Sequence, residues 1–243
     1  MGHAGPGPLE PTRGVRVHGL STIAVIPARG GSKGVPRKNL RPLRGRSLVA
    51  RAVEIGLATC SAVVVSSDDA RINREAVEAG AGFVLRPAEL ATDEAPMLPV
   101  VQHAIRGLKG DVVVLLQPTQ PLRTAAHVLA ALSLLAETDA ASVVSVVEVP
   151  QHFSPDYVLD LGGMGEAWPW DDPGGDLDRM ATRRQTARRS YSRDGTVYVV
   201  RREVVEAGSL YGRDCRALVI QPGESVNIDD EDDWRRAESM VTS

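Results

Sequence analysis

Residues 27–39 combine glycines with positively charged side chains, a combination suited to binding phosphate. Glycine lets backbone N–H groups approach an anion because it has no side chain to keep them apart; here the glycines are Gly30, Gly31 and Gly34. Charge that could neutralise a polyphosphate comes from Arg29, Lys33, Arg37 and Lys38. The order Ser32-Lys33-Gly34 is not the Gly-Lys-Ser/Thr order of a Walker A loop. This glycine–lysine loop therefore predicts another kind of phosphate site, with a solvated basic turn as the alternative.

Short apolar runs alternate with helical patterns around this loop. The runs lie at residues 22–26, 62–66, 82–85, 112–116 and 142–149. We expect helices between them, the first capped by Ser47 and the second by Asp68 or Asp69, with later ones at 97–108 and 125–137. Near-continuous apolar strands alternating with helices indicate a parallel sheet covered on both faces. Ligands bind such a sheet at the carboxyl ends of its strands, where the glycine–lysine loop follows the first run.

The alternation breaks at residues 150–194, which show no clean period. We expect this segment to be an excursion from the sheet or an arm that reaches a partner subunit. Strands at 196–200 and 216–220 follow, and then a helix led by Asp230 that contains Trp234. With residues 1–20 as a flexible tail, residues 21–243 are expected to form one domain.

Composition excludes several classes of protein. The net charge of -3 does not suit a general nucleic-acid binder, which would be basic. No apolar run approaches the roughly 18 residues of a membrane span, and the first 20 residues lack the apolar core of a secretory signal. The two cysteines are too few for a disulfide framework. We expect a cytoplasmic protein with neither a nucleic-acid nor a membrane partner.

A longer string and several later blocks resemble a known family. Residues 24–40, from Ala24 to Leu40, are similar to the first motif of acylneuraminate (CMP-sialic acid) cytidylyltransferases. Later blocks that also resemble the family are Ser66-Ser-Asp-Asp69, Leu85-Arg-Pro87 with Asp93, Leu115-Leu-Gln-Pro-Thr119, Pro121-Leu-Arg123, Arg184-Gln185, Gly195-Thr-Val-Tyr198 and Ile228-Asp229 with Asp233-Trp234. The resemblance implies a Rossmann-like α/β nucleotidyltransferase fold with a mostly parallel sheet, in which residues 150–194 form a dimerisation arm.

The resemblance also implies a reaction and the residues that bind the nucleotide. An acceptor oxygen would attack the α-phosphorus of CTP and release pyrophosphate, with Arg29 and Lys38 in the catalytic role of neutralising the leaving group. The expected nucleotide-binding residues are Arg29, Gly30, Gly31, Ser32, Lys38, Asn39, Arg86 and Gln117. For Arg86 a surface position is the open alternative.

Magnesium and the acceptor are assigned by the same resemblance, and this chain departs from the family at both. The family's Asp-Ile-Asp metal element is here Asn227-Ile228-Asp229, so Asn227 offers Mg²⁺ a neutral oxygen beside the Asp229 carboxylate. Arg184 and Gln185 are expected to bind the carboxylate of an anionic small-molecule acceptor, although the residues after them differ from the family pattern.

Three functions stay open at this point. The first is activation of a sialic-acid-like 2-keto-3-deoxy sugar acid as its CMP derivative. The second is the same transfer to another nonulosonic or octulosonic acid or to a small phosphonate. The third is a nucleotide-binding protein that has lost catalysis, which Asn227 suggests.

Overall fold

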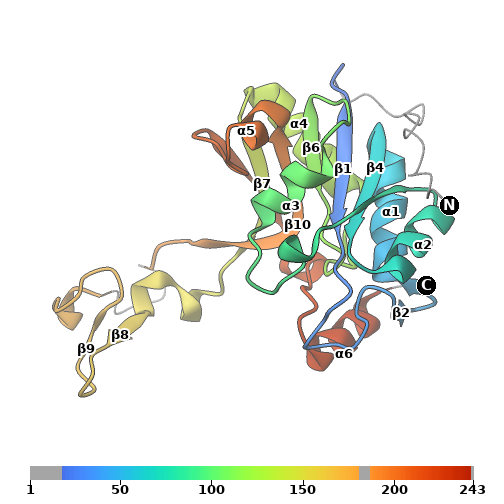
Figure 1. The fold of residues 1–243 in the computed structure, drawn as a ribbon. Coiled ribbons are helices and arrows are strands. Elements are labelled where there is room, and N and C mark those ends of the chain that lie inside the picture. Colours follow the sequence, from blue (N-terminus) through green and yellow to red (C-terminus); the bar gives the residue numbers. More distant parts are fainter. Residues whose placement is uncertain (1–17, 181–186, 242–243) are drawn as a thin grey trace.

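A seven-stranded sheet forms the centre of the molecule in the computed structural model, which describes residues 18–180 and 187–241 (Figure 1). Its strand order is β11-β7-β10-β6-β1-β4-β5. The strands are β1 (Thr22–Pro27), β4 (Ala62–Ser67), β5 (Gly82–Leu85), β6 (Val112–Leu115), β7 (Ser142–Glu148), β10 (Tyr191–Arg201) and β11 (Cys215–Ile220). Within this sheet β10 runs antiparallel to both of its neighbours, while the other pairs are parallel. The predicted mostly parallel α/β fold is confirmed.

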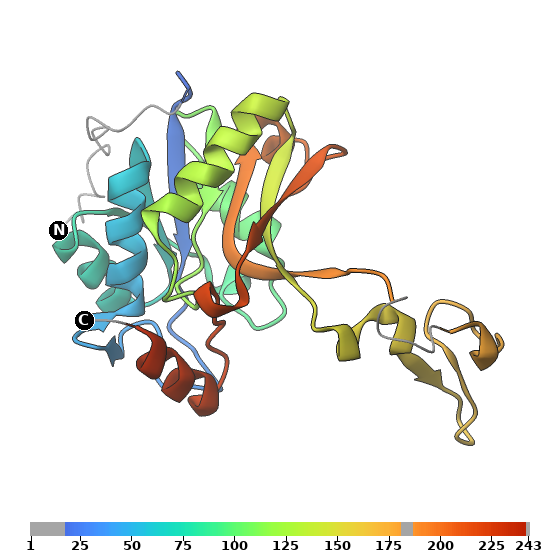
Figure 2. The same ribbon diagram turned by 180° about the vertical axis from the view of Figure 1, so that it is seen from behind.

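Helices cover both faces of the sheet (Figure 2). One face packs against α1 (Leu48–Thr59), α2 (Ala70–Glu78) and α4 (Ala125–Thr138), and the other against α3 (Met97–Ala104) and α5 (Arg202–Glu206). The alternation of side chains in β1 explains this division, because Ala24 and Ile26 enter the first core whereas Ile23 and Val25 enter the second. No helix among the described residues has the length and apolar character needed to cross a bilayer.

Three helix starts follow from the capping residues expected from the sequence. Ser47 Oγ accepts a hydrogen bond from Ala50 N at 3.0 Å and begins α1. Of the two candidates for the second cap, Asp69 is the one used, since its side chain accepts from Arg71 N. Asp230 caps α6 (Glu231–Met240). Each cap satisfies backbone donors that the first turn of a helix leaves without a partner.

A third, smaller core holds α6 against the carboxyl edge of the sheet. Trp234 of α6 is 2% exposed and packs with Val35 of the glycine–lysine loop and with Ile228. The pair β2 (Pro42–Leu43) and β3 (Arg46–Ser47) adds Leu43 to this cluster. Buried apolar contact therefore joins the loop after β1 to a segment nearly two hundred residues later.

Residues 149–180 and 187–190 leave the sheet and form an extended arm (Figures 1 and 2). The arm contains short 3-10 turns and the small pair β8 (Leu159–Leu161) and β9 (Ala167–Pro169). Its two ends meet where Val149 N donates to Ser190 O at 2.9 Å. The expected excursion is present, but β10 already begins at Tyr191, so residues 191–194 belong to the sheet.

Candidate active site

The carboxyl ends of β1, β4 and β6 deliver the predicted site residues to one edge of the sheet. The glycine–lysine loop follows β1, Asp68 and Asp69 follow β4, and Gln117 lies just after β6. The segment Asn227–Asp229 joins the same edge because Ile228 N donates to Thr119 O at 2.9 Å. Four segments that are distant in sequence therefore meet where an open α/β sheet binds ligands.

Close approach fixes the path of the glycine–lysine loop. Gly30 N donates to Asp68 Oδ1 at 2.9 Å, so this backbone N–H holds an anionic carboxylate. At Gly34 an added Cβ would lie 1.9 Å from the carbonyl oxygen of Asp229, a distance that no side chain can occupy. Asn39 is 8% exposed and its side-chain amide donates to Arg29 O at 2.9 Å. The buried Asn39 side chain therefore stabilises the path of the loop. Its contact with nucleotide stays a prediction.

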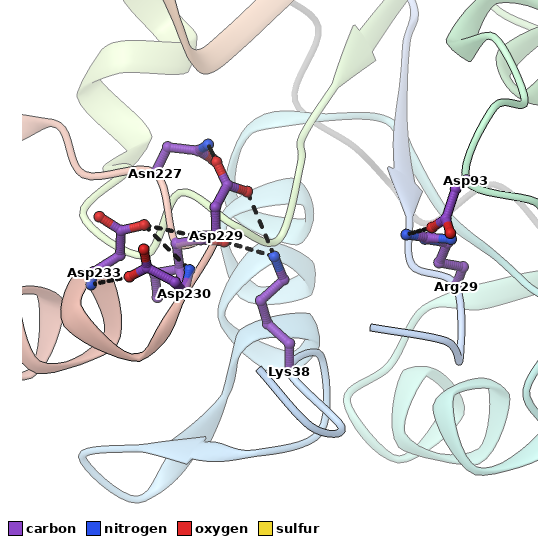
Figure 3. Close-up of polar contacts among 8 residues, drawn as sticks. Arg29, Lys38, Asp93, Asn227, Asp229, Asp230 and Asp233 are labelled. Atoms are coloured by element: carbon purple, nitrogen blue, oxygen red, sulfur yellow. Dashed lines mark hydrogen bonds and ion pairs between the residues drawn. The ribbon is translucent and has the colours of Figure 1, made fainter. Parts of the chain in front are cut away.

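Lys38 connects this loop to the segment expected to bind metal (Figure 3). Its ammonium group donates to Ile228 O at 2.6 Å and lies 3.7 Å from Asp229 Oδ1. Only 13% of the Lys38 side chain is exposed, whereas 71% of the Asp229 side chain is exposed. Burial lowers the pKa of Lys38, and the attraction of Asp229 opposes that effect. The structure thus brings Lys38, one of the two residues expected to be catalytic, next to Asp229, one of the two expected to bind metal.

Asn227 contacts the other oxygen of the same carboxylate. Its side-chain amide nitrogen donates to Asp229 Oδ2, which leaves the amide oxygen as the atom that could bind a cation. The carboxylate of nearby Asp233 already accepts hydrogen bonds from Asp229 N and Asp230 N at the start of α6. The described residues contain no group of three His, Cys, Asp or Glu that could hold a metal ion by itself. One exposed carboxylate and one amide oxygen nevertheless fit Mg²⁺, which usually binds one or two protein carboxylates together with substrate phosphates and water.

Arg29 points to a different partner. Its guanidinium forms an ion pair with Asp93 Oδ1, and Lys33 Nζ pairs with Asp93 Oδ2. In Figure 3 the Arg29–Asp93 pair lies apart from the Lys38–Asp229 pair. The two predicted catalytic cations therefore lie at one edge of the sheet, but each is held by its own carboxylate.

Arg86 lies beside a groove of about 690 Å³ lined by Asp68, Leu85, Arg86, Pro87, Ala88 and Ala91. Arg86 is 6% exposed and donates to Ser66 O at 2.7 Å and to Ser66 Oγ at 3.2 Å, so it is not the surface residue of the alternative interpretation. Burial lowers the pKa of its guanidinium. The groove has the volume of a small-molecule site, and the contact of Arg86 with nucleotide stays a prediction.

Gln117 is positioned by a residue to which sequence reasoning gave no role. Arg123 is 6% exposed, and its guanidinium donates to Gln117 O at 2.6 Å and to Thr196 O. Burial lowers the pKa of Arg123 to about 9. Gly195, with φ +83°, lies so close that an added Cβ would be 2.9 Å from Gln117 Oε1. In the sequence, Arg123 is marked only by its place in the block Pro121-Leu-Arg123. The fold is needed to show that its guanidinium is buried and hydrogen-bonded to Gln117.

The remaining predicted residues have less defined surroundings. Gly31 is exposed, with no atom within 4 Å of the position of an added Cβ, and Ser32 is half-buried. Arg184 and Gln185, the expected acceptor-binding residues, lie outside the described residues. On the described part of the arm, Arg188 is held by Asp156, to which its Nε donates at 2.7 Å.

Known proteins resemble this chain in sequence and in fold. A family model described as "Cytidylyltransferase" matches residues 23–158. N-acylneuraminate cytidylyltransferase of Escherichia coli is 30% identical over 223 residues, covering 88% of this chain and 51% of the relative. CMP-N,N'-diacetyllegionaminic acid synthase of Legionella pneumophila is 31% identical, covering 91% of this chain and 97% of the relative. The chain thus spans about half of the first relative and nearly all of the second.

The structure of a CMP:2-keto-3-deoxy-manno-octonic acid synthetase complexed with CTP aligns with this chain at a TM-score of 0.68 and 17% identity. The alignment covers 90% of this chain and 98% of that one, so the two share a fold. The family model covers more than half of the chain, and the Legionella relative matches it over nearly its whole length. The protein belongs to the cytidylyltransferase family.

Proposed function

We propose that this protein is a CTP-dependent cytidylyltransferase that forms the CMP derivative of a sialic-acid-like 2-keto-3-deoxy sugar acid and releases pyrophosphate. The observation that carries the proposal is the approach of Lys38 to Asp229 at the sheet edge where the glycine–lysine loop and the Arg86 groove also lie. The names of the relatives support it, since those relatives are named for acylneuraminate and diacetyllegionaminic acid.

Charge neutralisation is the main task of the site in this reaction. An acceptor oxygen forms a bond to the α-phosphorus of CTP, and the bond from that phosphorus to the pyrophosphate oxygen breaks. Negative charge passes to the departing pyrophosphate, which a fixed cation stabilises without further reorganisation. Lys38 is such a cation because its hydrogen bond to Ile228 O holds it in place. Arg29 supplies a second charge on the same loop.

Magnesium is part of the proposal. Asp229 and the amide oxygen of Asn227 would hold the ion, which supplies positive charge to the triphosphate when bound. The hydrogen bond from Asn227 to Asp229 orients the carboxylate for this purpose. Substituting an amide for the family's first carboxylate keeps an oxygen ligand while removing one negative charge.

We expect Asn227→Asp to lower the Mg²⁺ concentration needed for half-maximal pyrophosphate release by about three- to tenfold, because a carboxylate attracts the ion more strongly than an amide. A magnesium titration at saturating CTP measures this value. Gln221→Glu, which adds the same charge at another exposed position of the segment before Ile228, is the control and should leave it unchanged. An unaltered midpoint for Asn227→Asp would remove Asn227 from the metal site.

The arm supports a further part of the proposal, a homodimer. Large apolar side chains are exposed along it, including Phe153 at 65%, Leu161 at 67% and Met164 at 92%. Exposed apolar side chains on a projecting segment are typical of a protein–protein interface. A second copy of this chain is the partner that the family resemblance implies.

Replacing Leu161 and Met164 together by aspartate is expected to shift the protein toward monomer, weakening self-association by at least about tenfold, because charges would be buried in an apolar contact. Sedimentation velocity over a concentration series measures the shift. Val77→Asp is the control, since Val77 is 54% exposed on α2 rather than on the arm. A wild-type protein that is monomeric at every concentration would refute the dimer itself.

The test of the function is pyrophosphate release, measured with CTP, GTP, ATP and UTP against a panel of acceptor acids, with and without Mg²⁺. We expect release only with CTP, a sialic-acid-like acid and Mg²⁺. If pyrophosphate is released from CTP only when the acceptor is a phosphonate, the acceptor is a phosphonate and not a sugar acid. Absence of release with every combination would refute the enzymatic function. A cytoplasmic location, where CTP is available, belongs to the same proposal.

A further inference from the structure

Asp93 neutralises two cations of the glycine–lysine loop at once. One of its carboxylate oxygens pairs with the Arg29 guanidinium and the other with the Lys33 ammonium. Arg29 is 33% exposed at its side chain and Lys33 is 85% exposed, so both cations lie within reach of a ligand from solvent. The carboxylate therefore stands where an anion would have to bind in order to use both charges.

The two ion pairs make Asp93 a tightly held anion. The hydrogen bond from Lys33 and then that from Arg29 lower the pKa of Asp93, which keeps it charged. Its backbone lies in residues 91–96, an irregular connection between the 3-10 turn Ala88–Leu90 and α3. Ala91 N donates to Ala88 O at 3.0 Å at the end of that turn, and residues 92–96 lie outside any helix or strand. The side chain can thus leave the cations while the elements on either side stay in place.

We propose that Asp93 is an internal stand-in for the triphosphate: it occupies Arg29 and Lys33 in the free protein, is displaced when CTP binds, and returns to them as pyrophosphate leaves. This inference rests on the proposed function and assigns a selectivity to the same site. A carboxylate and a phosphate group compete for the same guanidinium and ammonium donors. A ligand has to replace both ion pairs, so the exchange favours ligands with several adjacent negative charges.

The expected effect of Asp93 on affinity depends on whether the ligand carries phosphate groups. CTP and pyrophosphate reach the two cations and therefore work against Asp93. Cytidine, which has no phosphate, binds beside Asp93 without displacing it. Removing the Asp93 charge should consequently tighten the first two ligands and leave cytidine unchanged, a pattern that a general change in the fold would not produce.

The experiment is isothermal titration calorimetry of the full chain with CTP, pyrophosphate and cytidine, comparing the wild type with Asp93→Asn. We expect Asp93→Asn to bind CTP and pyrophosphate about three- to tenfold more tightly, the range for losing two partly exposed ion pairs. Glu94→Gln is the matched control. It removes one negative charge from the same connection, and Glu94 forms no ion pair with any described residue. Its affinities should stay within about twofold of the wild type.

The outcomes separate this inference from the function on which it rests. A wild-type protein that binds neither CTP nor pyrophosphate would refute the proposed function. A wild-type protein that binds CTP, together with an Asp93→Asn variant that binds CTP no more tightly, would refute the displacement. Weaker binding by the variant would in addition make Asp93 a residue that supports nucleotide binding. Equal tightening by Glu94→Gln would also refute it, since the effect would then be that of net charge.

Discussion

Lys38→Ala is expected to lower kcat/KM for pyrophosphate release by at least about a hundredfold, the loss typical of removing one fixed group that stabilises transition-state charge. The ammonium group is held 2.6 Å from Ile228 O and 3.7 Å from Asp229 Oδ1, so it faces the segment expected to bind the triphosphate through Mg²⁺. Alanine leaves no cation there. A steady-state assay with CTP and the acceptor gives the ratio directly.

The free energy of unfolding of Lys38→Ala should change much less than its activity. Desolvation is the largest influence on Lys38 and lowers its pKa, so the charged form is less favoured in the folded protein than in the unfolded chain. Removing that charge should therefore cost little free energy of unfolding. Lys109→Ala, at an exposed lysine beyond α3, is the control for activity. A Lys38→Ala variant that unfolds far below the wild-type Tm would mean that its lost activity reports folding, and near-normal activity would remove Lys38 from the site.

Local patterns in the sequence are enough to predict most of this fold. Ser47 and Asp230 cap helices where expected, because a cap needs only a side-chain oxygen and the two or three residues that follow it. The helix predicted over 97–108 ends earlier, at Ala104. Its apolar pattern continues because Leu108 still packs against the second core from a turn that contains Gly107 at φ +79°. Apolar spacing shows that a residue is buried, not that the helix continues.

Other features depend on partners that are distant in sequence. Nothing local shows that β10 runs antiparallel or that it begins at Tyr191, since both follow from pairing with β6 and β7. The candidate site likewise has a part that the local sequence shows and a part that depends on distant residues. The glycine–lysine loop is legible because its residues are adjacent, whereas the contact of Lys38 with Ile228 spans 190 positions. The pairing of Arg29 with Asp93 joins two loops that have no periodic pattern.

Gly34→Ala is expected to damage both activity and stability, since it acts on the contact that holds the loop to the metal segment. The added Cβ would lie 1.9 Å from the backbone oxygen of Asp229 and 3.1 Å from its carbonyl carbon. Backbone cannot turn aside as the end of a flexible side chain can, so either the loop or the segment before α6 has to shift. Overpacking of this kind costs about 1–3 kcal/mol of the free energy of unfolding.

Such a shift would move Lys38 away from Asp229. Lys38 lies on the same loop as Gly34, and Asp229 is the residue whose backbone Gly34 approaches. A misplacement of about 1 Å can cost about a hundredfold in rate, so we expect kcat/KM to fall by about that factor. Urea unfolding and the pyrophosphate assay measure the two effects. Gly223→Ala is the matched control: it lies in the segment leading to Asp229, has no atom within 4 Å of an added Cβ, and should keep both values. If Gly34→Ala keeps full activity, the close approach of the two backbones is not needed to set the distance between Lys38 and Asp229.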